Sequence, residues 1–226
     1  MGRKPGERPY IAVIGDLVAS RMLDRRDEAQ EKVVAVLQQA NEVWESELEA
    51  GFVVTIGDEF QGLLRRPDRA FDVIASLEQG LGGIRTRYGI GLGTVRTELL
   101  PTALGMDGTA FHCARDAVER GKREDRWITV AGFGDDRDYL LNGVLRLMGG
   151  IRWAWTRVQA ETVFAVRTTP TQKLVAKARQ VSEATVSKAL KAALYEQFAE
   201  GEELVATLLS TPADRVSLSP RLVDKE

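Results

Sequence analysis

The chain has 226 residues, of which 44% are hydrophobic and 28% are charged, and its formal net charge is −2. This is the composition of a globular protein with a core, and the small net charge excludes a protein that coats nucleic acid over its whole surface. One cysteine and one histidine exclude a disulfide framework and a structural zinc site. The first residues lack the apolar run of a signal peptide, and no stretch reaches the roughly 18 apolar residues of a membrane helix. We therefore expect a cytoplasmic protein.

The first part of the chain alternates short strands with amphipathic helices. Runs of β-branched and aromatic residues bounded by turn residues predict strands, and apolar residues spaced by three and four predict helices. Strands are expected at 10–14, 52–56, 60–64, 88–95 and 127–131, and helices at 25–48, 67–81 and 109–120. Gly57-Asp58-Glu59 is expected to form a hairpin turn. The glycines of 88–95 predict the close approach of another backbone or of a ligand.

The order of these elements is strand, helix, strand, strand, helix, strand, with an added helix and strand. This order predicts an α+β fold with a ferredoxin-like or palm (βαββαβ) domain over residues 1–135. A helical region at 139–164 follows, so an all-α domain is expected over 136–226.

Residues 171–194 have the pattern of a DNA-binding helix-turn-helix. A short helix marked by Leu174, Val175 and Ala178 precedes a turn at Val181-Ser182, and Ser182 is a favourable N-cap for a second helix. In that helix Val186, Ala189, Leu190 and Ala193 are expected to face inward. The preceding helix, with Trp155, Thr156 and Gln159, would complete a three-helix unit.

Charge is concentrated on this motif. Residues 171–195 carry five basic residues against one acidic residue, whereas 196–226 carry seven acidic against three basic. Short polar residues at the start of such a helix can reach base edges, and lysines can contact phosphates. The expected contacts with double-stranded DNA are Gln172, Lys173, Ser182, Glu183, Thr185, Ser187, Lys188 and Lys191. The alternative is a helical hairpin that only packs, with its lysines in solvent.

A second candidate site consists of acidic residues. If the first strand pairs antiparallel with the strand after the hairpin, Asp16 meets Asp58 and Glu59. Three carboxylates suit Mg²⁺ or Mn²⁺, which commonly also bind phosphates. Arg21, Arg115 or Arg120 could then bind the phosphates of a nucleotide. The alternative is that Gly-Asp-Glu is only a hairpin turn.

These segments resemble those of nucleotide cyclases. TIGDEFQGLL is similar to the hairpin of class III nucleotide cyclases and of GGDEF diguanylate cyclases, GDLVAS to the cyclase metal-binding strand, and YGIGLGTV to their later glycine strand. GTAFHCAR resembles the helix that in cyclases carries a ribose-binding Asn and, four residues later, an Arg. The resemblance implies two-metal phosphoryl chemistry with Asp16 and Asp58 as ligands.

The sequence also departs from the cyclase pattern. Val54 stands where cyclases have a lysine, and Phe111 stands at the Asn position when Arg115 is aligned with their arginine. Aligning His112 with the Asn instead moves the arginine out of register. Ile56 replaces the first glycine of GGDEF. Two base- or ribose-reading positions are therefore absent, and whether the protein is an enzyme stays open.

The ordered set GDLVASR, TIGDEFQG, RYGIGLG and G-x-A-F-H-x-A-R, followed by the terminal motif, resembles the SatD family of bacterial proteins over 10–193. The resemblance implies a regulator-like domain arrangement. The first hypothesis is thus a homodimeric DNA-binding transcriptional regulator whose cyclase-like domain senses a nucleotide and metal. The second is an active nucleotidyl cyclase or nucleotidyltransferase. The third is a palm domain that serves only for dimerisation.

Overall fold

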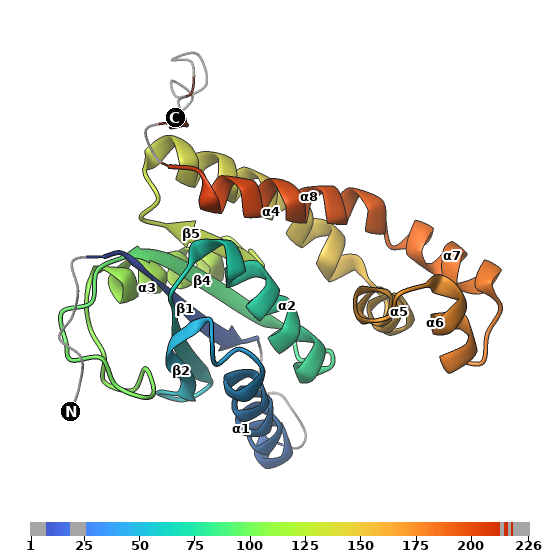
Figure 1. The fold of residues 1–226 in the computed structure, drawn as a ribbon, viewed down its shortest axis with the longest axis horizontal. Coiled ribbons are helices and arrows are strands. Elements are labelled where there is room, and N and C mark those ends of the chain that lie inside the picture. Colours follow the sequence, from blue (N-terminus) through green and yellow to red (C-terminus); the bar gives the residue numbers. More distant parts are fainter. Residues whose placement is uncertain (1–7, 19–25, 213–214, 217, 219–226) are drawn as a thin grey trace.

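The fold is built on a mixed sheet of five strands. The computed structural model describes residues 8–18, 26–212, 215–216 and 218. The strand order is β2-β3-β1-β4-β5, and β1 pairs antiparallel with both β3 and β4, whereas β4 and β5 are parallel (Figure 1). The strands are β1 (Tyr10–Leu17), β2 (Leu48–Val54), β3 (Glu59–Leu64), β4 (Thr86–Gly93) and β5 (Ile128–Ala131).

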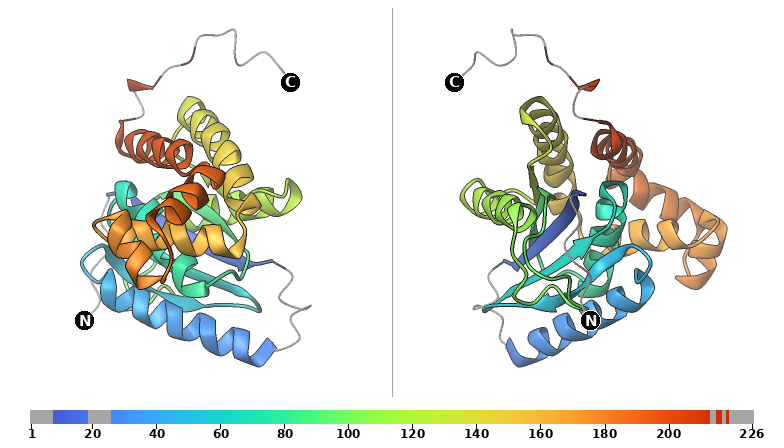
Figure 2. Two further views of the ribbon diagram at one scale, coloured as in Figure 1. Left: turned by 90° about the vertical axis from the view of Figure 1, so that its right-hand side faces the viewer. Right: turned by 60° about the vertical axis from the view of Figure 1, so that its left-hand side comes forward.

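Helices cover both faces of this sheet. On one face α1 (Arg26–Val43) and α2 (Ala70–Leu81), which follows the short 3-10 helix η2 (Pro67–Arg69), pack on Ile11 and Val13. On the other face α3 (Thr109–Arg123) packs on Ala12 and Ile14 (Figure 2). Alternate residues of β1 thus point to opposite sides, as the two-residue period of a strand requires.

The expected order of strands and helices is the observed one, and the mixed α+β class is confirmed. Some limits differ. The helix expected over 25–48 ends at Val43, and Leu48 already belongs to β2, where it pairs with Leu64 of β3. Glu59 is the first residue of β3, so only Gly57 and Asp58 form the turn. The comparison with ferredoxin-like or palm domains stays a prediction.

The glycine-rich strand β4 lies directly beneath α3. A Cβ added at Gly89 would lie 2.2 Å from the carbonyl oxygen of Ala114, and one added at Gly91 would lie 2.2 Å from that of Ala110. Both positions therefore accept no side chain. The expected close approach of another backbone is confirmed, and the approaching backbone is that of α3.

Two long helices extend the core of the sheet. Helices α4 (Asp135–Ala154) and α8 (Tyr195–Ser210) pack on each other (Figure 1), and their buried residues share one cluster with the sheet and α2. The expected boundary near residue 135 coincides with the start of α4, yet Leu141 and Leu145 belong to this common core. The division into domains at 135 stays a prediction.

Three shorter helices form a separate cluster at one end of the molecule (Figure 1). They are α5 (Arg157–Thr168), α6 (Gln172–Ala178) and α7 (Glu183–Ala192). Val163, Val175, Val186 and Leu190 are their buried core. Because Trp155 packs against both this cluster and the main core, it joins the two.

The helical segments also correct several expectations. The region expected as one helical stretch over 139–164 is interrupted after Ala154, and Thr156 begins α5 with a capping box in which Gln159 takes part. In α6 the inward residues are Val175 and Ala176, whereas Leu174 and Ala178 are exposed. Seven residues make only two turns, and an offset of one residue rotates the buried face by about 100°, so the pattern alone fixes this face poorly.

Candidate functional site

Two carboxylates meet where β1 ends and β3 begins. Asp16 lies directly opposite Glu59 in the antiparallel register, as the sequence predicted. Asp16 shares its side of β1 with Ala12 and Ile14, which pack under α3, so both carboxylates lie on the α3 face. Their side chains are only 15% and 16% exposed. Two nearly buried carboxylates on one face require cations beside them.

Helix α3 supplies these cations. Arg115 and Lys122 lie on one side of α3 together with Glu119, at spacings of four and three residues. The guanidinium of Arg115 forms an ion pair with Glu59. The ammonium of Lys122 lies 3.1 Å from Asp16 Oδ1, 3.0 Å from Glu59 Oε1 and 3.0 Å from Glu119 Oε1. Lys122 therefore connects the ends of both strands to the helix.

The surroundings shift the pKa values of Asp16, Glu59 and Lys122. Burial raises the pKa of the Asp16 carboxyl, and Lys122 offsets only part of that effect. Burial also acts to raise the pKa of Glu59, but hydrogen bonds from Arg115 and Lys122 outweigh it, so that this pKa is lowered. Burial opposes the charge of Lys122, yet its carboxylate partners outweigh burial and raise the pKa of the ammonium. Lys122 is thus a permanent cation.

Asp58, the third expected acidic residue, is joined to β1 by a backbone hydrogen bond. The carbonyl of Asp58 accepts a hydrogen bond from the Leu17 N–H at 3.2 Å, which closes the sheet beside Asp16. Within the described ranges, no three His, Cys, Asp or Glu side chains are grouped as a metal ion requires. Moreover, Arg115 and Lys122 contact both oxygens of Glu59. As arranged, these residues do not fit Mg²⁺ or Mn²⁺, and their role as ligands stays a prediction.

The expected phosphate-binding arginines are placed differently from one another. Arg21 lies outside the described residues. Arg115 belongs to the site and its side chain is 41% exposed. Arg120 does not contact the carboxylates of the site. Its guanidinium donates a hydrogen bond to the carbonyl of Val130 at 2.7 Å, which holds α3 against β5. Of the three, Arg115 is the residue that the fold brings to the carboxylates.

Sequence reasoning missed Lys122 and Glu119. Their signal was the spacing from Arg115, which places all three on one face of an amphipathic helix. Val54 and Phe111 indicate only which residues of the cyclase pattern are absent. A lysine two turns beyond the motif is recognisable only once α3 is known to pass the end of β1.

The second candidate site is the outer surface of α6 and α7. Ser182 caps α7 by accepting a hydrogen bond from the Thr185 N–H at 3.1 Å, as predicted. Gln180 has a left-handed backbone (φ 55°) where the chain reverses between the helices. All eight side chains expected to contact DNA are exposed: Gln172, Lys173, Ser182, Glu183, Thr185, Ser187, Lys188 and Lys191. Val186, Leu190 and Ala193 are buried as expected.

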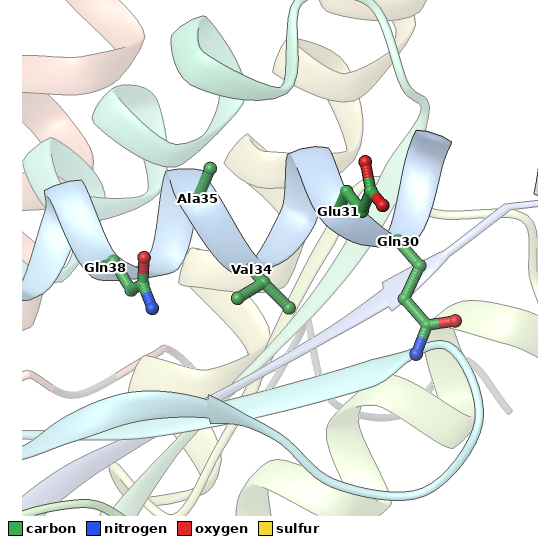
Figure 3. A pocket seen from close by; sticks show the side chains of 5 residues that line it. All are labelled: Gln30, Glu31, Val34, Ala35 and Gln38. Carbon is green, nitrogen blue, oxygen red and sulfur yellow. The ribbon is translucent and has the colours of Figure 1, made fainter. Parts of the chain in front are cut away.

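A pocket also lies along α1, on the face of the sheet opposite to α3 (Figure 3). The residues that line it are Gln30, Glu31, Val34, Ala35 and Gln38. Two amides, one carboxylate and two small apolar side chains do not form a set of groups for catalysis. In the part of the chain that the structure describes, no helix is long and apolar enough to cross a membrane.

Comparison with known families identifies the family of this chain. It matches the SatD family over residues 10–209 and belongs to that family. No curated protein matches it.

Two solved structures that are similar to the chain are each described as the structure of a bacterial light-regulated adenylyl cyclase. The first has 12% sequence identity and a TM-score of 0.42, and the match covers 57% of this chain and 44% of that one. The second has 14% identity and a TM-score of 0.41, with 54% and 74% covered. The chain thus spans less than half of the first structure, and TM-scores below 0.5 do not establish a shared activity.

Proposed function

We propose that this SatD family member is a DNA-binding transcriptional regulator whose cyclase-like domain senses a nucleotide. The observation that carries the proposal is the outer face of α7. Thr185, Ser187 and Lys188 are exposed there, whereas the opposite face is buried against α5 and α6. Polar and cationic side chains are thus presented together on a capped helix that projects from the molecule.

A recognition helix that enters the major groove presents polar and cationic side chains on one exposed face, as α7 does. Base edges in the major groove are reached by side chains in the first turns of the helix, where Glu183, Thr185 and Ser187 lie. Phosphates are reached by lysines further along, where Lys188 and Lys191 lie. A helix-turn-helix of this kind usually acts in a homodimer on a pseudo-palindromic site, and we include that state in the proposal.

Binding to genomic DNA fragments tests the proposal. We expect salt-sensitive mobility shifts, and we expect the variant with both Lys188→Ala and Lys191→Ala to lower the salt slope by about two, because each lost phosphate contact removes about one unit. Lys32→Ala is the matched control, since Lys32 is an exposed lysine of α1, outside α6 and α7. Absence of salt-sensitive binding to any fragment would contradict the proposal.

The nucleotide-sensing part rests on Arg115. Its guanidinium is held by Glu59 at the edge of the site and is partly exposed, so a phosphate can reach it without displacing the sheet. Guanidinium groups bind phosphates in a bidentate manner, which makes Arg115 the first contact for a nucleotide. The second candidate, nucleotidyl transfer, would need Asp16 and Glu59 to exchange Lys122 for a metal ion, because as arranged these carboxylates are paired with cations.

Thermal denaturation with ATP, GTP and other nucleotides distinguishes these functions. We expect a bound nucleotide to raise the Tm by about 2–4 °C for each kcal/mol by which it stabilises the folded state of a chain of this length. Arg115→Met should abolish the rise, whereas Arg123→Met, an exposed arginine at the end of the same helix, should not. Chromatography of the same samples detects turnover, which would identify an enzyme. An unchanged Tm with every nucleotide would instead favour a domain used only for dimerisation.

A further inference from the structure

The ammonium of Lys122 occupies the place between the strands where a metal ion would be expected. An ammonium has three N–H donors, and three carboxylates surround this one: Asp16 on β1, Glu59 on β3 and Glu119 on α3. The three distances are 3.0–3.1 Å: the ammonium donates hydrogen bonds to Glu59 and Glu119 and forms an ion pair with Asp16. The Lys122 side chain is 30% exposed, and its ammonium contacts all three carboxylates.

The charges of this cluster are nearly balanced without a metal. Asp16, Glu59 and Glu119 contribute three negative charges, and Lys122 and Arg115 contribute two positive charges. Glu59 uses Oε1 for Lys122 and Oε2 for Arg115, so neither of its oxygens is free for a metal. Mg²⁺ would need these oxygens at about 2.0–2.1 Å in near-octahedral geometry. It could not approach them while the ammonium remains.

We infer that Lys122 is a built-in cation that replaces a divalent metal ion between Asp16 and Glu59. It joins β1, β3 and α3 and keeps the carboxylates neutralised whether or not divalent cations are present. The acidic motif that suggests a metal site in the sequence is therefore a lysine-neutralised cluster. This inference does not depend on DNA or nucleotide binding.

Manganese binding to the full-length protein tests this role. Binding of Mn²⁺ is measured by electron paramagnetic resonance and by isothermal titration, without nucleotide. We expect weak binding to the wild type and binding at least about ten-fold tighter to Lys122→Met, because the carboxylates lose both a bound cation and its repulsion of the metal. Adding Asp16→Asn to Lys122→Met should remove the gain.

Two controls separate this effect from general charge loss. Lys32→Met removes one lysine from exposed α1 and should leave Mn²⁺ binding unchanged, and Lys122→Arg retains the cation and should not gain binding. Circular dichroism verifies that each variant is folded. Equal Mn²⁺ affinity in the wild type and in Lys122→Met would overturn the inference. So would a folded Lys122→Met that binds no Mn²⁺.

Discussion

Replacing Arg152 by methionine is expected to lower the free energy of unfolding by about 3–5 kcal/mol, because it leaves a buried carboxylate without its cation. Glu78 is 5% exposed, and Arg152 donates to its Oε2 from Nε at 2.7 Å. The indole N–H of Trp127 donates to Oε1 at 3.1 Å. Arg152 also stacks over Trp155, at 5.1 Å from the ring centroid. The Arg152–Glu78 ion pair therefore links α2 with α4 and with Trp155, the residue that joins the helical cluster to the main core.

The loss should depend on pH in a defined direction. Burial raises the pKa of Glu78 even with Arg152 present, and removing Arg152 raises that pKa further. Between the unfolded and folded pKa values, the folded state binds more protons, so stability falls as pH rises. The destabilisation by Arg152→Met should therefore be greater at about pH 8 than at about pH 5, where Glu78 gains a proton more readily.

Urea unfolding at both pH values measures this effect. The double variant Glu78→Gln with Arg152→Met is the control. It removes the unpaired charge while keeping an acceptor for Trp127, and it should recover part of the lost stability and lose the pH dependence. A single variant as stable as the wild type, or equally destabilised at both pH values, would contradict a buried and charged Glu78.

Replacing Gly91 by alanine is expected to cost about 3 kcal/mol, at the upper end of typical overpacking. The new Cβ would lie 2.2 Å from the Ala110 oxygen and 2.3 Å from the Ala114 nitrogen. Both are backbone atoms of α3, so no side-chain rotation can relieve the contact, and α3 must move away from β4. Such a movement would also displace Arg115 and Lys122 from the carboxylates.

A second glycine provides the matched control. Gly143 lies within α4, and a Cβ added there would meet nothing within 4 Å. Gly143→Ala should therefore stabilise the protein by about 0.5–1 kcal/mol, since alanine is the better helix former. Thermal and urea unfolding of both variants give the comparison. If Gly91→Ala unfolds like the wild type, α3 does not pack against β4 as closely as the structure shows.

Much of the fold was predictable because its signals are local. The two-residue period of β1 and the three- and four-residue period of α1 follow from side-chain direction within each element. Ser182 caps α7 through its own nearest backbone neighbours, so its role was evident in the sequence. Where an element was short or irregular, as at Leu48 in β2, packing against other elements decided the outcome and the local pattern failed.

The site was predictable only in part, for the same reason. The meeting of Asp16 and Glu59 follows from the antiparallel pairing of β1 with β3, which the βαββαβ order of elements predicts. The expected metal site depended instead on which groups lie opposite those carboxylates. Lys122 follows them by more than sixty residues, and no local pattern relates the two positions.

Residue types and their spacing therefore established the order of strands and helices, the acidic pair and the exposed cationic helix, because each depends on neighbours along the chain. Only tertiary packing placed α3 across the ends of β1 and β3, brought the ammonium of Lys122 to the carboxylates and joined α4 and α8 to the main core. These contacts link residues far apart in sequence, and their energies depend on burial, which exists only in the folded chain.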